Sequence, residues 1–204
     1  MIVLPGMQPM MRNTTGWILY LPGKSSLNLD IANRVRDGGH YLPWQYDENN
    51  RPKHAKYRLV VLGNLDYHTW SKESTAAPVM SQLELRLLTS LAVYNRRVLK
   101  NCDVKQAFIQ SSLPADEEYF LRPLLGCPRS KPGQYWRLLR SLYGLKRAPK
   151  LWYKMLSSHL KAMGLKCSET SPCIFYGVLV PGEPPVYVGI YVDDIIYFST
   201  SDIT

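Results

Sequence analysis

Two segments of the chain carry apolar residues at the spacing of an α-helix. The first covers residue 81 to about residue 95, and Ser81-Gln82-Leu83-Glu84 at its start is typical of a capping box. The second covers residues 149–163 and is followed by Gly164, which favours a helix C-cap. The apolar positions are Leu83, Leu87, Leu88, Leu91 and Ala92 in the first segment, and Leu151, Trp152, Met155, Leu156, Leu160 and Met163 in the second. Each helix therefore has one face to bury against a partner.

Shorter runs of apolar and β-branched residues predict strands. Near the end of the chain, residues 174–180, 186–191 and 195–200 form three such runs, joined by a turn rich in Pro and by Val192-Asp193-Asp194. Further strand candidates are residues 56–62, 97–104, 119–122 and 135–139. Residues 1–52 are expected to form a loop-rich lead-in with one or two short strands. This order predicts an α+β fold with a mostly antiparallel sheet packed on helices.

Positive charge is concentrated in one part of the chain. The net charge is +9, yet residues 129–166 alone contain ten Lys or Arg and no Asp or Glu, which leaves −1 for all other residues. A charged run is usually a solvated face, but this one is interleaved with aromatic residues that can stack on bases while the cations neutralise phosphates. In the helix predicted for residues 149–163, Lys150, Lys154 and Lys161 fall within about 40° of one another, opposite the apolar face. The pattern is as consistent with a nucleic-acid surface as with a solvated face.

Cysteine usage and apolar runs narrow the class of protein. The cysteines Cys102, Cys127, Cys167 and Cys173 form no Cys-x-x-Cys pair, and no His lies at metal-finger spacing. They are therefore expected to be reduced thiols of a cytosolic or nuclear protein. The apolar runs are shorter than the roughly 20 residues needed to cross a bilayer, so we expect no membrane-spanning segment.

Two adjacent carboxylates, Asp193 and Asp194, separate two predicted strands. An Asp-rich β-turn is the ordinary explanation, because Asp favours turns, although like charges this close destabilise a hairpin apex unless something compensates. The apolar flanks would hold both carboxylates at the apex, within reach of a divalent cation. Asp103, near the end of the strand predicted for residues 97–104, is the candidate for a third carboxylate. Such carboxylates can hold two Mg²⁺ ions ~3.5–4 Å apart for phosphoryl transfer, because Mg²⁺ prefers hard oxygen ligands.

Several motifs appear in an order that resembles one family. They are Asp103-Val-Lys-Gln-Ala-Phe108, Ser141-Leu-Tyr-Gly-Leu-Lys-Arg-Ala-Pro149 with Trp152-Tyr153, and Tyr191-Val-Asp-Asp194. They resemble the first, second and third palm motifs of copia-type reverse transcriptases. An earlier part of the chain resembles the fingers segment that precedes these motifs in the family. Its residues are Lys56-Tyr-Arg-Leu-Val60 with Gly63-Asn64, Ala77-Pro-Val79 and Leu85-Arg-Leu-Leu88. The resemblance covers about residues 53–202. It implies an RNA-directed DNA polymerase whose right-hand fold contributes fingers and a partial palm in residues 53–204.

The resemblance also implies roles for the carboxylates. Asp103 and Asp193 would bind the metal ions, together with the Val104 carbonyl, and Asp194 would lie beside them. The expected cofactor is two Mg²⁺ ions, with Mn²⁺ as an alternative. The 3′-hydroxyl of a primer would attack the α-phosphate of a deoxynucleoside triphosphate and release pyrophosphate.

The same resemblance implies residues that bind nucleotide and nucleic acid. Phe108 would lie under the sugar and exclude a 2′-hydroxyl, although in isolation it would be interpreted as a core residue. Arg58 and Lys56 would bind the triphosphate, a task that suits bidentate Arg. The remaining nucleotide-side residues are Tyr143, Lys146 and Gly144, the last because glycine permits close backbone approach. The residues expected to contact template or primer are Arg147, Lys150, Lys154, Lys161 and Tyr191.

The resemblance further predicts what accompanies this chain. Because the sequence stops at Thr204, we expect the thumb and RNase H domains to be absent, and the isolated chain to have weak or no activity, since remote contacts hold the reacting ends in line. The expected partners are an RNA or DNA template with primer, deoxynucleoside triphosphates, and the remainder of the pol polyprotein, namely thumb, RNase H and integrase. The expected location is the cytoplasm, in a virus-like particle, or the nucleus.

Two other functions compete with this interpretation. A non-catalytic remnant or co-opted nucleic-acid-binding module would keep the basic surface and lose turnover. A different two-metal enzyme, such as a nuclease, is disfavoured by the aromatic residue Phe108, because a nuclease needs no sugar gate.

Overall fold

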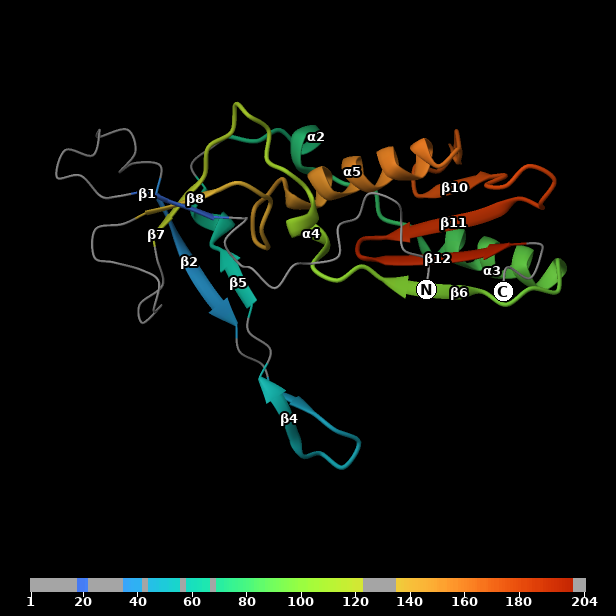
Figure 1. Cartoon of the computed structure of the whole chain (residues 1–204), viewed down its shortest axis with the longest axis horizontal. Helices are drawn as coiled ribbons and strands as arrows, with labels where there is room; N and C mark the ends of the chain where they lie inside the picture. Colours follow the sequence, from blue (N-terminus) through green and yellow to red (C-terminus); the bar gives the residue numbers. More distant parts are fainter. Residues whose placement is uncertain are drawn as a thin grey trace. The chain divides into compact units, whose positions relative to one another are not determined.

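The computed structural model describes residues 18–21, 35–41, 44–55, 58–66, 69–122 and 135–199 (Figure 1). These residues form two compact units, each described by itself. Unit 1 contains residues 72–107 and 149–199, and unit 2 contains the described residues before residue 72 together with residues 108–148. Among the described residues, none of the helices combines the length and the apolar character needed to span a membrane.

Unit 1 is built on an antiparallel sheet with the strand order β6-β12-β11-β10-β9. Its strands are β6 (Lys100–Asp103), β9 (Lys166–Cys167), β10 (Ile174–Gly177), β11 (Val186–Tyr191) and β12 (Asp194–Ser199). Its helices are α2 (Lys72–Thr75), α3 (Gln82–Tyr94) and α5 (Ala148–Ala162), the last beginning at the boundary of the unit. The final three strands confirm the predicted hairpin-like unit.

Helix α3 packs on one face of this sheet. A Cβ on Gly189, in the middle of β11, would press on the side chains of Leu88 and Met80, so the helix approaches the strand closely where glycine leaves room. Ala92 and Phe198 belong to the same buried cluster. The predicted capping box is present, because Ser81 Oγ accepts from the Glu84 N–H while the Glu84 carboxylate accepts from the Ser81 N–H.

The other face of the sheet is buried as well. Since side chains alternate along a strand, Val188 and Ile190 point away from α3, and both are buried. Helix α5 contributes the buried residues Trp152, Leu156 and Leu160 to unit 1. It ends at Ala162, and Gly164, the glycine predicted to follow its end, has a φ of 95°, in the left-handed region that favours glycine.

Unit 2 contains a sheet with the strand order β1-β8-β7-β2-β5, in which only β2 and β7 pair in parallel. Its strands are β1 (Ile18–Leu21), β2 (Val35–Tyr41), β5 (Arg58–Val61), β7 (Phe120–Arg122) and β8 (Tyr135–Leu138). A hairpin of β3 (Trp44–Tyr46) and β4 (Pro52–Ala55), the 3-10 helix η2 (Gly63–Leu65) and the short helix α4 (Ala107–Gln110), which begins at the boundary between the units, complete the described elements. The core includes Val61, Tyr119, Leu121, Trp136, Leu138, Leu142 and Leu145.

Two expectations from the sequence need correction. Leu83 and Leu87 were expected on the buried face of α3, but they are 76% and 64% exposed. Leu83 lies about 140° around the helix from the buried Leu88, so the apolar arc is wider than the face that packs on the sheet. The lead-in also holds more strand than expected, because β2 runs for seven residues despite Gly38 and Gly39. Pairing with β5 and β7 on either side overrides their low strand propensity.

The start of α3 predicts a pH dependence of stability. The Ser171 hydroxyl, and then Ser81, donate hydrogen bonds that hold the pKa of Glu84 below its ordinary value. A lowered pKa in the folded chain contributes stability that is complete above the unfolded pKa, about 4.3, and is lost as the pH falls through the folded pKa. Glu84→Gln should therefore lower the free energy of unfolding at pH 7, and the difference from wild type should shrink towards pH 3.

Urea unfolding followed by circular dichroism at several pH values checks this expectation. Glu183→Gln, at an exposed turn residue, is the matched control and should leave the pH profile unchanged. If Glu84→Gln and wild type show the same dependence of the free energy of unfolding on pH, the prediction is contradicted.

Candidate active site

Two of the predicted carboxylates face each other across neighbouring strands. Asp194 opens β12 and is the register partner of Asp103, the last residue of β6. Directly opposed residues of antiparallel strands have Cα atoms about 4.5–5.5 Å apart and side chains on the same face. Asp103 and Asp194 are exposed, and Asp193, in the turn between β11 and β12, is partly buried. The sheet therefore brings together carboxylates that lie about ninety residues apart in the chain.

The turn that carries Asp193 is held in an unusual conformation. Val192 has a φ of 56°, which is an outlier for a β-branched residue. The indole Nε1 of Trp152, a residue only 1% exposed, donates to the Val192 carbonyl at 2.6 Å. The Val104 N–H donates to the next carbonyl, that of Asp193, at 2.8 Å. Both turn carbonyls thus have a partner from outside the hairpin, and these bonds offset the cost of the strained backbone.

The donor chemistry of this apex fits a hard divalent cation, because carboxylate oxygens are the ligands that Mg²⁺ prefers. Across the residues that the structure describes, however, no group of three or more His, Cys, Asp or Glu residues is arranged to hold a metal ion. The register supplies the opposed pair Asp103 and Asp194. The metal-binding roles of Asp193 and of the Val104 carbonyl stay predictions.

Burial shapes the titration of the neighbouring groups. The pKa of the Cys102 thiol is raised above its ordinary value by burial, and further by the negative charges of Asp103 and Asp194. Burial also raises the pKa of Tyr153 to about 12, so its hydroxyl stays protonated and donates to the Pro172 carbonyl at 2.8 Å. Burial and the two carboxylates therefore disfavour the thiolate form of Cys102.

Unit 2 gathers several of the predicted nucleotide-side residues. The rings of Phe108 and Tyr143 meet edge to face with centroids 4.9 Å apart. The Tyr143 carbonyl accepts from the Val61 N–H at 2.7 Å, which ties the loop to β5. Gly144 has a φ of 92°, and a Cβ on it would overlap the Val61 carbonyl, while a Cβ on Gly63 would overlap the Gly144 carbonyl. Glycine is required at both positions.

The predicted cations lie in different settings. Arg58 opens β5, whereas Lys56 lies outside the described residues. Lys146 is exposed, and its ammonium lies 3.5 Å from the Asp66 carbonyl. Arg147 is only partly exposed and forms an ion pair with Glu117.

The lysines of α5 and Tyr191 follow the sequence prediction only in part. Lys154 and Lys161 are exposed, as expected for a lysine stripe. Lys150 is half-buried and donates a hydrogen bond to the Glu73 carbonyl at helix α2. Tyr191, at the end of β11, is 49% exposed. Contact of these residues with nucleic acid stays a prediction.

Sequence reasoning missed the contacts of three residues, one in unit 1 and two in unit 2. Trp152 was predicted on the apolar face of a helix and within a motif of the family resemblance, but its indole N–H gave no signal of its partner. Gly63 was interpreted as the end of a strand, although its pairing with Asn64 in a fingers-like motif could have marked it as a site of close approach. Trp70 gave no signal at all.

Comparisons with known proteins agree with the motifs. A family model described as reverse transcriptase (RNA-dependent DNA polymerase) matches residues 39–204. The chain is 32% identical over 157 residues to the retrovirus-related Pol polyprotein from transposon RE1 of Arabidopsis thaliana, covering 74% of this chain and 10% of the relative. It is 34% identical over 146 residues to the RE2 polyprotein of the same plant, covering 69% and 10%. It is 27% identical over 192 residues to that of transposon TNT 1-94 of Nicotiana tabacum, covering 93% and 14%.

The three matched relatives are transposon Pol polyproteins, which defines the class of protein that this chain resembles. Within that class, the chain belongs to the reverse transcriptase (RNA-dependent DNA polymerase) family. The resemblance to copia-type elements is thereby confirmed. The chain spans about a tenth of the length of the RE1 and RE2 relatives that it matches.

The bond from Trp152 to Val192 leads to a prediction about the turn. Trp152→Phe keeps an aromatic ring in the core but removes the donor, so the Val192 carbonyl loses its partner. We expect the free energy of unfolding to fall by about 1–3 kcal/mol, the cost of an unsatisfied buried group plus lost packing. Val192→Gly removes the strain of a positive φ, so it should stabilise the Trp152→Phe chain more than it stabilises the wild-type chain.

Urea unfolding of the four chains in a double-mutant cycle measures this coupling. Tyr153→Phe, which removes a hydrogen bond from the neighbouring residue of α5 to the Pro172 carbonyl, is the control and should not couple to Val192→Gly. Additive effects of Trp152→Phe and Val192→Gly would contradict the role given to the indole.

Proposed function

We propose that this chain carries the RNA-directed DNA polymerase core of a retrotransposon and transfers nucleotides by two-metal catalysis. The observation that carries the proposal is the register of β6 and β12, which opposes Asp103 to Asp194 beside the constrained turn of Asp193. The family match supports the same reaction. Unit 1 would correspond to a partial palm and unit 2 to fingers.

The carboxylates would act as the binding site for the reacting groups. When bound, two Mg²⁺ ions would activate the attacking oxygen and stabilise the leaving oxygen. Asp103 and Asp193 would be the main ligands, the Val104 carbonyl would add an oxygen, and Asp194 would set the local field or ligate transiently. The Val104 N–H is already bonded to the Asp193 carbonyl, so this contact would hold the two ligand-bearing segments at a fixed spacing.

The nucleotide would be bound by residues of unit 2. Phe108, with its ring against Tyr143, would be held rigidly enough to exclude a 2′-hydroxyl. Gly144 would let the backbone approach the nascent base pair, because glycine carries no side chain. Arg58, Lys56 and Lys146 would neutralise the triphosphate.

Nucleic acid would be held by a separate set of residues. The exposed Lys154 and Lys161 would contact phosphates, and Tyr191 would contact the primer or template. The other proposed partners are the remaining parts of a pol polyprotein, and the proposed location is a virus-like particle in the cytoplasm or the nucleus.

One observation favours a second candidate function. The exposed Lys154 and Lys161 on α5 could contact phosphates whether or not the carboxylates hold metal ions. A non-catalytic nucleic-acid-binding module would have these properties.

Primer extension separates the two functions. The purified chain is incubated with an RNA template, a DNA primer, Mg²⁺ and deoxynucleoside triphosphates, and is compared with Asp193→Asn. We expect slow extension by the wild-type chain and at least about a hundredfold less by the variant, because removal of a charged transition-state contact typically costs on the order of 10²–10³ in rate.

Template binding by fluorescence anisotropy runs in parallel and should be unchanged in Asp193→Asn. Asp116→Asn, in an exposed loop, is the control for a general loss of negative charge. Salt-sensitive binding without any extension would favour the binding module over the polymerase.

A further inference from the structure

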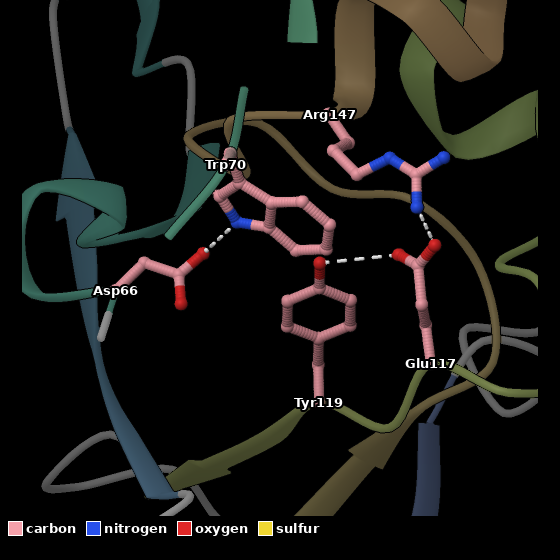
Figure 2. Close-up of polar contacts among 5 residues, drawn as sticks. All are labelled: Asp66, Trp70, Glu117, Tyr119 and Arg147. Carbon is pink, nitrogen blue, oxygen red and sulfur yellow. Dashed lines mark hydrogen bonds and ion pairs between the residues drawn. The ribbon is translucent and has the colours of Figure 1, made fainter. Parts of the chain in front are cut away.

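Arg147 has unusual surroundings for a residue expected to bind nucleic acid. Its guanidinium forms an ion pair with the Glu117 carboxylate, and the two side chains are only 21% and 10% exposed. The same guanidinium lies over the ring of Trp70, 5.0 Å from the centroid. Figure 2 shows these residues pointing toward one another from three separate segments of unit 2.

Each partner of Arg147 is itself held in place. The Glu117 carboxylate accepts a second hydrogen bond from the hydroxyl of the buried Tyr119 at 3.2 Å. The indole Nε1 of Trp70 donates to Asp66 Oδ2 at 2.8 Å (Figure 2). The positive charge of Arg147 is thus neutralised by a largely buried carboxylate, and its guanidinium carbon lies over an aromatic ring.

These contacts disfavour a phosphate as the partner of Arg147. A phosphate would have to displace Glu117 and leave a largely buried carboxylate without its cation, which is costly. The Nε of Arg147 is also buried without a hydrogen-bond partner in the described part of the chain. The guanidinium is therefore positioned by Glu117 and Trp70 and offers little surface to an incoming ligand.

The position of Arg147 in the loop gives these contacts a consequence. The loop carries Tyr143, Gly144 and Lys146, the residues proposed to bind the nucleotide. At one end it is attached to β5 by the bond from Val61 to Tyr143 and by the interlocked glycines. At the other end Arg147 attaches it to the segments of Trp70 and Glu117. A short loop fixed at both ends presents its side chains in one geometry.

We propose that Arg147 is a positioning residue: together with Glu117 and Trp70 it fixes the loop of Tyr143, Gly144 and Lys146 for nucleotide binding, and it does not contact the nucleic acid. This inference rests on the proposed function, because it assigns the loop to the nucleotide. It favours arginine over lysine, because the several donors of the guanidinium can pair with the Glu117 carboxylate while its central carbon lies over the Trp70 ring.

The test compares Arg147→Lys, Glu117→Gln and the double variant with wild type. Arg147→Lys keeps the charge but loses the planar group. A contact with phosphate would therefore largely survive, whereas the joint contact with Glu117 and Trp70 would not. Glu117→Gln frees Arg147 from its anion. The matched control is Arg137→Lys, because Arg137 pairs with Glu118 at 3.0 Å but both side chains are more than a third exposed.

Two affinities are measured on each chain at a temperature at which circular dichroism shows it folded. The first is that of a fluorescent deoxynucleoside triphosphate in the presence of primer and template. The second is that of the primer–template alone, as a function of salt. We expect both single variants to weaken nucleotide binding on the order of tenfold, and the double variant no more than either, because contacting residues are not additive. Template affinity and its salt slope should stay at the wild-type values, and Arg137→Lys should change neither affinity.

Three results would overturn the proposal. One is an Arg147→Lys chain that binds nucleotide as wild type does. Another is a Glu117→Gln chain that binds template more tightly and with a steeper salt slope, since each phosphate contact adds roughly 0.7–0.9 to that slope. The third is an equal effect of Arg137→Lys, which would indicate general destabilisation.

Failure of the proposed function has a different signature. In that case the wild-type chain itself binds no nucleotide and extends no primer. A double-mutant cycle of Arg147→Lys and Glu117→Gln in urea unfolding, together with the salt slopes of template affinity, then tests whether Arg147 is a positioning residue. Non-additive effects of the two substitutions on the free energy of unfolding, with unchanged salt slopes, support the positioning role. Additive effects, or a steeper salt slope for Glu117→Gln, reject it.

Discussion

The antiparallel register of β6, β12 and β11 is the constraint on which the candidate active site depends. It opposes Asp103 to Asp194, and a slip of one residue would send one carboxylate to the other face of the sheet. The register is fixed from both sides. Leu88 of α3 packs where Gly189 leaves space on one face, and Trp152 of α5 holds the carbonyl of Val192 at the turn. Asp103 and Asp194 are thus exposed residues on strands whose pairing, with the bonds to the Val192 and Asp193 carbonyls, fixes their positions.

The same device of close backbone approach recurs in unit 2. Gly63 and Gly144 interlock, and neither tolerates a Cβ. Their contact fixes the loop that follows β8 against β5, and the ion pair of Arg147 with Glu117 fixes its far end. In each unit, chemistry-bearing side chains stand on a short turn whose two ends are held by residues distant in sequence. Such preorganisation is what a polymerase site requires, because charge stabilisation is effective only when the groups are already in place.

Local signals in the sequence predicted those elements whose causes are local. The capping box at Ser81, the glycine after α5 and the hairpin of β11 and β12 were all predictable, because each depends on neighbouring residues. Strand β2 was not, since Gly38 and Gly39 form strand only through pairing with β5 and β7. Likewise, the sequence identifies Arg147 as a cation but not Glu117, thirty residues earlier, as its partner. The exposed Leu83 and Leu87 show that periodicity gives an apolar arc but not the part that is covered.

Binding of Mn²⁺, followed by electron paramagnetic resonance in the absence of nucleotide and nucleic acid, tests most directly whether this register builds a cation site. The titration compares the wild-type chain with Asp103→Asn, Asp194→Asn and the control Asp116→Asn, whose carboxylate lies in an exposed loop. A Mn²⁺ site that weakens at least about tenfold in the first two variants and persists in the control would agree with opposed carboxylates that share an ion. Equal binding by all four chains would contradict it.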